Sequence, residues 1–468
     1  MLPISPTPHV AVLGGGITGL TAAWQLKRAG FTPVVFEKAL RVGGAIGTFR
    51  ADGWLHELGP NSLLESSTAV AQFIEDAGLG GRRVYAAPQA SKRYVVRDGE
   101  PVAMPGSPAS FLTTPLFSSR AKLALLGEPF RRRSPAGAEE SVAEFVVRRL
   151  GAEFLDYAVN PFVGGVYAGD PQRLSVRHGF PKLHALEQEH GSLLRGAFAR
   201  RNASGGPKGR MFSFPQGMEE LPLALARSLG DAVRLDTTVR VIKPHGHYWE
   251  LVSDQDGIVR NEIFSAVVCA LPADALATLH FEGISQPRRL DHLSEIEHPP
   301  VASVFMGFRR EDVSHPLDGF GLLVPEVEHG DILGTLFSST LFPGRAPAGH
   351  VALTTFVGGT RQPELARLGD GALHDLVRGE LSRLLGVRRD PAFVHVQRWP
   401  RAIPQYTLDY GRHKEAVVAF ESSAPGLFIG GNCRDGISLA SCIESGRRLS
   451  EAVAARATMP ESSFALAN

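Results

Sequence analysis

The chain has 468 residues, of which 43% are hydrophobic and 21% are charged, and its formal net charge at pH 7 is +1. This mixture supports a large packed core in about two or three domains and excludes a chain that is disordered throughout. Because acidic and basic residues balance, the chain lacks the basic excess typical of a nucleic-acid-binding protein. Three cysteines are too few for a disulfide framework, and their odd number fits a reducing compartment.

The amino-terminal segment predicts no export signal. Met1–His9 contains three prolines and no lysine or arginine, whereas a secretory signal begins with a basic region. The apolar stretch Val10–Leu20 is interrupted by glycines, and no segment reaches the roughly 20 apolar residues that span a bilayer. We therefore expect a cytoplasmic protein, either soluble or peripheral on the cytoplasmic face of the membrane.

Three segments near the start of the chain predict a strand, a helix and a second strand. Val10–Leu13 is short, apolar and rich in β-branched residues, as a buried parallel strand is. Leu20–Ala29 has the composition of a helix and is followed by Gly30, the residue type that most often ends one. Pro33–Phe36 is again apolar and leads directly to Glu37. This order is typical of the first half of a dinucleotide-binding domain.

The turn between the strand and the helix carries the phosphate-binding pattern G-x-G-x-x-G. Gly14 permits the tight turn, Gly16 lets a pyrophosphate approach the backbone, and Gly19 lets helix and strand pack closely. The helix N-terminus stabilises phosphate charge, and Glu37, 18 residues after the last glycine, can accept ribose hydroxyls. The residues expected to bind this part of the cofactor are Gly14, Gly15, Gly16, Ile17, Thr18, Gly19 and Glu37.

A second loop favours FAD over NAD. After Glu37 the chain continues with Lys38, Arg41 and the pair Gly43-Gly44, which gives the spacing E-x-x-x-R-x-G-G. A second phosphate-facing loop with a cation suits a long, extended FAD better than a transient NAD. The arrangement resembles the flavin amine oxidase superfamily, which includes monoamine oxidases, phytoene desaturases and protoporphyrinogen oxidases.

Further segments narrow the resemblance. They are Gly59-Pro60-Asn61-Ser62, the run GVYAGDP from Gly165 to Pro171, Arg398-Trp399-Pro400 with Ile403-Pro404-Gln405-Tyr406 after it, and Gly431-Asn432 followed by Gly436-Ile437-Ser438-Leu439. Together they resemble the oxygen-dependent protoporphyrinogen/coproporphyrinogen oxidase family of haem synthesis, over nearly the whole chain. The GPNS and GVYAGDP segments are more specific than the glycine motifs, which the entire superfamily shares.

The resemblance implies an α/β fold with three parts. The first is a discontinuous, Rossmann-like FAD-binding domain of the p-hydroxybenzoate-hydroxylase type, over 1–85, 211–271 and 396–468. The second is a mixed α+β substrate-binding domain over 86–100 and 272–395, and the third is a helical, membrane-associating insertion over 101–210. The strand-like segments Ala232–Ile242 and Ala266–Leu271 are expected to return the chain to the FAD-binding domain.

The same resemblance implies the reaction. One noncovalent FAD per chain would oxidise protoporphyrinogen IX to protoporphyrin IX, removing six electrons in three flavin cycles, with O2 as acceptor and H2O2 released. The cysteines do not match the superfamily's covalent-flavin motif. The expected partners are the porphyrinogen, O2 and a membrane surface, with a homodimer and hand-over of product to a ferrochelatase as further expectations. No nucleic acid is expected.

Three residues match substrate-site positions of the family. Arg93 matches an arginine that binds a propionate, and a guanidinium fork suits a carboxylate. Lys92 beside it would point to the other face of a strand. Asn61 matches a position that faces flavin and substrate, and Gly165 matches a glycine that lines the pocket, so Asn61 and Arg93 are the expected catalytic residues. The structural alternatives are a turn asparagine, a strand-edge arginine and a helix-end glycine.

The remaining cofactor contacts implied by the resemblance lie farther along the chain. Ser438–Val453 predicts a helix whose first backbone N–H groups would stabilise negative charge on the reduced flavin. Val239 would contact the adenine end, and Trp399 would pack on the flavin side of the cavity or, alternatively, in the core. The expected residues are Lys38, Arg41, Gly43, Gly44, Gly59, Pro60, Asn61, Ser62, Val239, Trp399, Gly431, Ile437, Ser438 and Leu439.

The predicted helical insertion is basic. Residues 101–210 hold 15 Lys and Arg against 9 Asp and Glu, in a chain that is nearly neutral overall. Arg131–Arg133 is a basic cluster, and Phe111, Leu112, Leu116 and Phe117 are apolar neighbours in the sequence. Basic side chains beside exposed apolar ones favour attachment to anionic lipid, and an ordinary solvated helix face explains the same charges.

Several other functions stay open. Coproporphyrinogen III is the alternative substrate for the same chemistry, and its two extra propionates would require more cations in the pocket. A flavin amine oxidase would need an aromatic cage, for which Tyr406 and Tyr410 near Trp399 offer one wall, and a carotenoid desaturase would need an apolar tunnel. A flavin- or porphyrin-binding carrier without turnover would share the FAD motifs. His184 and His190 lack metal-ligand spacing, so no metal site is expected.

Overall fold

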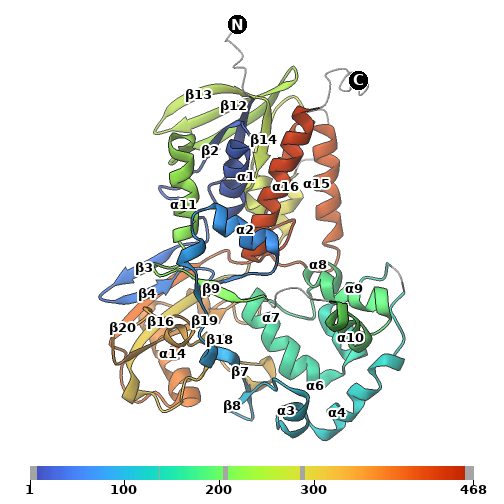
Figure 1. Cartoon of the computed structure of the whole chain (residues 1–468), viewed down its shortest axis with the longest axis vertical. Helices are drawn as coiled ribbons and strands as arrows, with labels where there is room; N and C mark the ends of the chain where they lie inside the picture. The colour runs from blue at the N-terminus through green and yellow to red at the C-terminus, as the bar shows by residue number, and fades with distance from the viewer. Residues whose placement is uncertain (1–7, 136, 204–208, 285–289, 459–468) are drawn as a thin grey trace.

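The computed structural model describes residues 8–135, 137–203, 209–284 and 290–458 (Figure 1). The upper part of the molecule in that view is built around a five-stranded sheet in the order β10-β2-β1-β14-β21, in which every pair is parallel. Its strands are β1 (His9–Leu13), β2 (Thr32–Phe36), β10 (Val233–Arg234), β14 (Ala266–Cys269) and β21 (Leu427–Ile429). Segments from the beginning, middle and end of the chain therefore meet in one sheet.

Both faces of this sheet are buried. Alternate residues of β1 supply two separate cores, with Val10 and Val12 in the first and Ala11 and Leu13 in the second. This alternation explains why the strand is apolar at every position. The helices of the first core are α1 (Ile17–Arg28), α2 (Thr68–Asp76), α11 (Glu220–Leu229) and α16 (Leu439–Ala457). Those of the second are α12 (Ala273–Ala277) and α15 (Gly411–Ser423).

The predicted elements of this region form, with changed bounds. The first helix begins at Ile17, inside the glycine turn, and not at Leu20, because the turn itself already has helical hydrogen bonding. The single strand expected over Ala232–Ile242 is wrong. The chain divides it into β10 and β11 (Thr238–His245), and only β10 joins the five-stranded sheet, whereas β11 pairs with β12 (Tyr248–Gln255). The carboxy-terminal helix begins at Leu439, with Ser438 as its N-cap.

Three smaller sheets surround the first one. A four-stranded sheet has the order β13-β12-β11-β15 and packs against the second core. Its remaining strands are β12 (Tyr248–Gln255), β13 (Ile258–Phe264) and β15 (His280–Phe281). The other two sheets are β3-β4, from Thr48–Ala51 and Trp54–Glu57, and β5-β9-β6, from Leu63–Leu64, Met211–Ser213 and Val84–Tyr85. They lie where the chain leaves the five-stranded sheet for the lower part of the molecule (Figure 1).

A mixed seven-stranded sheet forms one side of the lower part of the molecule, in the order β20-β16-β19-β18-β17-β7-β8 (Figure 1). All its pairs are antiparallel except β17 with β7. Helix α14 (Asp370–Leu385) packs its apolar side against this sheet. The strands are β7 (Lys92–Arg97), β8 (Glu100–Ala103), β16 (Val301–Arg309), β17 (Gly319–Leu323), β18 (Gly334–Leu336), β19 (His350–Gly358) and β20 (Phe393–Trp399), and α13 (Ser338–Leu341) follows β18.

The other side of the lower part is helical. Its helices are α3 (Pro108–Thr113), α4 (Ser119–Leu126), α5 (Val142–Arg149), α6 (Ala152–Phe154), α7 (Asn160–Tyr167), α8 (Val176–Gly179), α9 (Pro181–His190) and α10 (Leu193–Ala203). A π-helical turn over Leu155–Val159 separates α6 from α7. In the part of the chain that the structure describes, no helix is both long and apolar enough to cross a bilayer.

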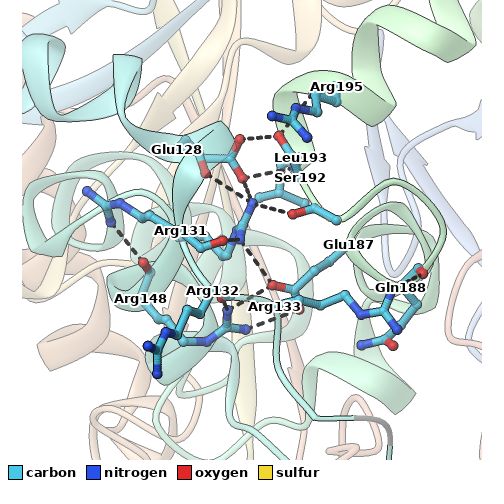
Figure 2. Close-up of polar contacts among 12 residues, drawn as sticks. Glu128, Arg131, Arg132, Arg133, Arg148, Glu187, Gln188, Ser192, Leu193 and Arg195 are labelled. Atoms are coloured by element: carbon cyan, nitrogen blue, oxygen red, sulfur yellow. Dashed lines mark hydrogen bonds and ion pairs between the residues drawn. The ribbon is translucent and has the colours of Figure 1, made fainter.

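The basic cluster of this helical side has mostly structural partners (Figure 2). Arg131 donates to the carbonyl of Arg148 at 2.8 Å, in the last turn of α5, and Arg133 donates to the carbonyl of Gln188 at 2.9 Å, in the last turn of α9. Cations at helix C-termini are stabilising, so these charges cap helices. The predicted group of exposed apolar neighbours is also partly wrong, because Leu116 and Phe117 are buried, while Leu112 is exposed.

Candidate active site

The glycine turn after β1 has the geometry that its pattern predicts. Gly14 has φ +102°, and its N–H donates to the carbonyl of Phe36 at 2.9 Å, which ties the turn to β2. A Cβ on Gly19 would lie 2.0 Å from the Gly14 carbonyl oxygen, so only glycine permits this approach of α1 to the turn. A Cβ on Gly16 would meet nothing within 4 Å. The turn therefore presents open space on the side of Gly16.

Glu37 and the second loop lie directly against that turn. The Glu37 carboxylate accepts hydrogen bonds from the N–H groups of Gly15 at 2.6 Å and Ala39 at 2.8 Å. The Gly43 N–H donates to the Gly15 carbonyl at 2.8 Å, and Gly44 comes close enough that its Cβ would lie 3.5 Å from the Gly16 Cα. Residues that are distant in the sequence are thus brought together around the open side of Gly16.

Arg41 and Lys38 differ in their surroundings. The guanidinium of Arg41 donates to three carbonyls of its own loop, those of Val42 at 3.1 Å, Ile46 at 2.8 Å and Gly44 at 2.8 Å. It therefore holds the second loop in shape, in addition to placing a positive charge there. Lys38 is exposed on the same loop.

The segment at the start of α16 completes this group. Ser438 caps the helix by accepting from the Ser441 N–H at 3.1 Å. Gly431, just after β21, donates its N–H to the Ser445 Oγ at 3.0 Å, and a Cβ on Gly431 would lie 3.9 Å from Thr18 Oγ1 at the start of α1. Ile437 and Leu439 flank the cap and are partly buried. The loop before α16 and the amino-terminal end of α1 therefore approach each other.

Three other predicted cofactor contacts lie near the second glycine loop or near Glu37. Gly59 packs against the second loop so closely that its Cβ would lie 2.1 Å from the Ala45 carbonyl oxygen. Trp399, at the end of β20, donates its indole N–H to the Leu58 carbonyl at 2.7 Å. Val239 lies on β11 at a bulge, two residues after Thr237, whose N–H donates to the Glu37 carbonyl at 2.9 Å. Pro60 and Ser62 are partly buried on either side of Asn61.

Asn61 lies beside a small cavity with an internal ion pair. Its Nδ2 donates to the Gly59 carbonyl at 3.1 Å, and the cavity is lined by Leu55, Glu57, Asn61, Ser338, Leu341, Phe342, Arg345 and Thr354. The Glu57 carboxylate accepts from Arg345 at 3.3 Å and from the Met218 N–H at 3.0 Å. Burial raises the pKa of Glu57, and the guanidinium opposes that rise. Burial also lowers the pKa of Arg345.

Strand β17 connects Arg93 to Gly165. The guanidinium carbon of Arg93, on β7, lies 5.4 Å from the ring centroid of Phe320 on β17. Gly165, on α7, faces the same strand, because its Cβ would lie 2.4 Å from a methyl group of Leu323. Phe320 packs with Leu341 and Phe342, which line the cavity beside Asn61. The three predicted substrate residues are therefore neighbours of one sheet surface, linked through these apolar side chains.

Arg93 differs from its neighbour Lys92 in its charge partners. Lys92 forms an ion pair with Asp318, which also accepts a hydrogen bond from Tyr94 at 2.5 Å. Arg93 is exposed, and within the described ranges it has no carboxylate at ion-pair distance. The strand directs the two cations differently, as its alternation predicts, and Arg93 retains its donors for an external anion.

Sequence reasoning missed the residues that support these groups. Leu323 and Phe320 belong to an ordinary apolar strand, and Glu57 and Arg345 are 288 positions apart, so no local pattern marks them. The three cysteines, Cys269, Cys433 and Cys442, are buried and free. Among the described residues, His, Cys, Asp and Glu form no cluster suited to a metal ion.

Comparisons with known proteins agree with this geometry. The family model described as "Flavin containing amine oxidoreductase" matches residues 17–454. The chain is 37% identical to protoporphyrinogen oxidase 2, chloroplastic/mitochondrial, of Arabidopsis thaliana, across 95% of this chain and 93% of the relative. It is 28% identical to the coproporphyrinogen III oxidase of Staphylococcus aureus (strain NCTC 8325 / PS 47), across 96% and 99%.

A solved structure shows the same fold. An Exiguobacterium sp. 255-15 chain, assigned provisionally as a protoporphyrinogen oxidase, superposes with a TM-score of 0.81 at 24% identity, over 98% of this chain and 100% of that one. The family model spans most of the chain, and its description includes a flavin cofactor. The chain therefore belongs to the flavin-containing amine oxidoreductases and, within them, to the protoporphyrinogen and coproporphyrinogen oxidase family.

Proposed function

We propose that this chain is an oxygen-dependent oxidase that binds one noncovalent FAD and converts protoporphyrinogen IX to protoporphyrin IX, with release of H2O2. The observation that carries the proposal is the identity to plant protoporphyrinogen oxidases over almost the whole chain. The arrangement of Arg93, Asn61 and Gly165 around one surface of the seven-stranded sheet supports it.

The residues of the glycine turns fit an extended dinucleotide. The open space at Gly16 is where a Cβ would stand in the way of a pyrophosphate, and the Glu37 carboxylate is held by two backbone N–H groups at the place suited to a ribose. Cys433, on the loop before α16, is buried, and burial raises the pKa of its thiol to about 12. Such a thiol stays protonated and is a poor nucleophile, which supports noncovalent binding.

When bound, the flavin supplies hydride acceptance and passes electrons to O2. The chain then has to hold the substrate. Arg93 has free guanidinium donors for a propionate, and the fork geometry permits two parallel hydrogen bonds. Asn61 places an amide at the junction between the second glycine loop and the cavity, where it orients the reacting carbon. Gly165 lies so close to Leu323 that a side chain at this position would displace the leucine, so glycine preserves the packing of α7 against β17 beside the proposed macrocycle site.

Coproporphyrinogen III is the second candidate substrate, because relatives at 28% identity are named coproporphyrinogen III oxidases. An amine oxidase site is less well supported. The aromatic side chains that would form its cage, Tyr406 and Tyr410, are each 1% exposed, and both hydroxyls bond to backbone carbonyls. A carotenoid desaturase and a carrier without turnover are supported by the shared FAD motif only.

We also propose the three-part organisation that the resemblance implies, with the FAD-binding part over 1–85, 211–271 and 396–468, the substrate-binding part over 86–100 and 272–395, and the helical part over 101–210. Leu112, Leu123, Leu126 and Phe130 are between 68% and 84% exposed on the helical part and support peripheral contact with a membrane. A cytoplasmic location, a homodimer and hand-over to a ferrochelatase are proposed from the resemblance alone.

The test uses purified protein loaded with FAD, in air, with protoporphyrinogen IX and coproporphyrinogen III in parallel. Porphyrin fluorescence is followed and corrected for spontaneous oxidation. The proposal expects faster oxidation of protoporphyrinogen IX. A preference for coproporphyrinogen III moves the assignment to the second candidate. No acceleration with either substrate, in protein that has retained FAD, contradicts the oxidase assignment.

A further inference from the structure

Two buried tyrosines hold the loop that connects β21 to α16. The hydroxyl of Tyr410 donates to the Cys433 carbonyl at 2.6 Å. The hydroxyl of Tyr406 donates to the Asn432 carbonyl and accepts a hydrogen bond from the Gly436 N–H at 3.0 Å. Tyr410 therefore touches the loop at one backbone group, whereas Tyr406 joins its two ends.

Burial keeps the hydroxyls of Tyr406 and Tyr410 protonated, so that both can donate hydrogen bonds. Burial raises the pKa of Tyr406 and of Tyr410 well above the ordinary value of a phenol. The two rings pack with centroids 4.3 Å apart, and the Lys414 ammonium lies 5.3 Å from the centroid of Tyr406 and 6.0 Å from that of Tyr410. A cation over both faces and close ring packing fix the position of the hydroxyls.

Gly436 links the Tyr406 hydroxyl to the predicted cofactor site at the start of α16. It has φ +116°, and it stands two residues before Ser438, the N-cap of α16. The position of its N–H therefore fixes the start of the backbone segment that carries the N–H groups of Ile437, Ser438 and Leu439. Tyr406 reaches these groups only through the backbone, because its own hydroxyl is already occupied on both sides.

The preceding residue attaches the same peptide to the substrate side. Gln405 is 2% exposed, and its Nε2 donates to the Tyr167 carbonyl at 2.8 Å, at the end of α7, the helix that carries Gly165. The Tyr406 carbonyl accepts from the Ser175 N–H at 2.8 Å, which adds a link to the segment before α8. Consecutive side chains therefore extend from one backbone segment to the substrate helix and to the α16 loop.

We propose that Tyr406 is a positioning residue for the flavin end of the active site, and that the dipeptide Gln405-Tyr406 sets the spacing between the α16 loop and helix α7. This inference rests on the proposed function, because it assigns the α16 N-terminus to the flavin. The expected effect of Tyr406 is on how the cofactor is bound and reduced, and that of Gln405 is on how the substrate is placed.

The test compares Tyr406→Phe with Tyr410→Phe. The second variant is a matched control, because it also removes one buried hydroxyl that bonds to the loop between β21 and α16. FAD affinity is measured by titrating apoprotein, and the flavin midpoint potential is measured in the loaded protein. For Tyr406→Phe we expect FAD affinity about tenfold weaker and a more negative potential. A tenfold change in the reduction equilibrium corresponds to about 30 mV for a two-electron couple. Tyr410→Phe should change FAD affinity and the reduction equilibrium by less than about threefold each, because the Gly436 N–H keeps its partner, the Tyr406 hydroxyl.

Gln405→Met provides the second variant. It should raise the KM for porphyrinogen while FAD affinity stays within about threefold of the wild type, because it removes the link to α7 and a local bond to the Ile403 carbonyl at 2.9 Å but leaves the Tyr406 contacts in place. If Tyr406→Phe does not fold, this variant decides, and an unchanged KM overturns the proposal. A folded Tyr406→Phe with wild-type FAD affinity and potential also overturns it. Wild-type protein that fails to bind FAD contradicts the proposed function instead, so the two failures are distinguishable.

Discussion

The imidazoles of His56 and His395 face each other with their Nδ1 atoms 2.8 Å apart, which joins strand β4 to strand β20. The second nitrogen of His56 lies 3.0 Å from the Ser303 Oγ, and His395 stacks on Phe49 with centroids 3.8 Å apart. One imidazole has to donate and the other has to accept, so the contact is lost when both rings are protonated. Burial, with a contribution from His395, lowers the pKa of His56 to about 3.

This contact predicts a loss of stability in acid. Between pH 6.5 and about 3 the unfolded chain binds a proton at His56 and the folded chain does not, so stability decreases as the pH falls through this window. From pH 7 to pH 5 the contribution is about 2 kcal/mol. Urea unfolding of the wild type and of His56→Gln at both pH values measures it. The variant should lose about 2 kcal/mol less on acidification, and equal losses would contradict the assignment.

Gly16→Ala and Gly19→Ala should separate binding from folding. A Cβ on Gly16 meets open space, so the apoprotein should keep its stability within about 1 kcal/mol, while FAD affinity falls by at least about tenfold. A Cβ on Gly19 would lie 2.0 Å from the Gly14 oxygen, so this variant should lose stability in the absence of cofactor. Thermal unfolding of both apoproteins and FAD titration check this. Equal FAD affinity in Gly16→Ala and the wild type would contradict binding of the pyrophosphate at the glycine turn.

Arg93→Met and Lys92→Met test the propionate contact. Loss of a hydrogen bond to a charged group costs about 1.5–3 kcal/mol, so kcat/KM for the porphyrinogen should fall about 10–100-fold in Arg93→Met. Lys92→Met removes a partly exposed ion pair with Asp318 and should change kcat/KM by less than about threefold. Steady-state kinetics with FAD-saturated protein give both values. Similar effects in the two variants would show that Arg93 has no special role.

The buried carboxylate of Glu128 should be essential for the helical part of the molecule (Figure 2). It pairs with the fully buried Arg149 and accepts from the Ser192 hydroxyl at 2.5 Å and the Leu193 N–H at 2.9 Å, at the start of α10. Glu128→Gln leaves the Arg149 charge without its main partner and should cost about 3–5 kcal/mol of unfolding free energy. Glu311→Gln, in an exposed pair, should cost less than about 0.5 kcal/mol. Denaturant unfolding distinguishes these values, and a cost below about 1 kcal/mol for Glu128→Gln would be inconsistent with this role.

The sequence predicted what depends on neighbouring positions. The turn from Gly14 to Gly19, the acid at Glu37 and the helix expected over Ser438–Val453 are local patterns, and the structure forms all three, with Ser438 as the N-cap of that helix. The break between β10 and β11 was not predicted, because a segment that alternates apolar and polar residues looks alike whether it continues in one sheet or passes to another.

Long-range partners explain the other differences. Charge counting could not reveal that Arg131 and Arg133 cap helices, since their acceptors are carbonyls 17 and 55 positions away. The role of Tyr406 likewise depends on Gly436, 30 positions away, and no composition or spacing marks that pair.

The proposed function requires that a porphyrinogen reduces flavin bound to this chain. The most direct measurement adds protoporphyrinogen IX, and separately coproporphyrinogen III, to FAD-loaded protein without oxygen, and follows flavin absorbance together with porphyrin formation. We expect rapid bleaching by protoporphyrinogen IX, with three flavins reduced for each porphyrin formed, and recovery of the absorbance when air is admitted. Flavin that stays oxidised with both porphyrinogens, in folded protein that has retained FAD, would contradict the claim.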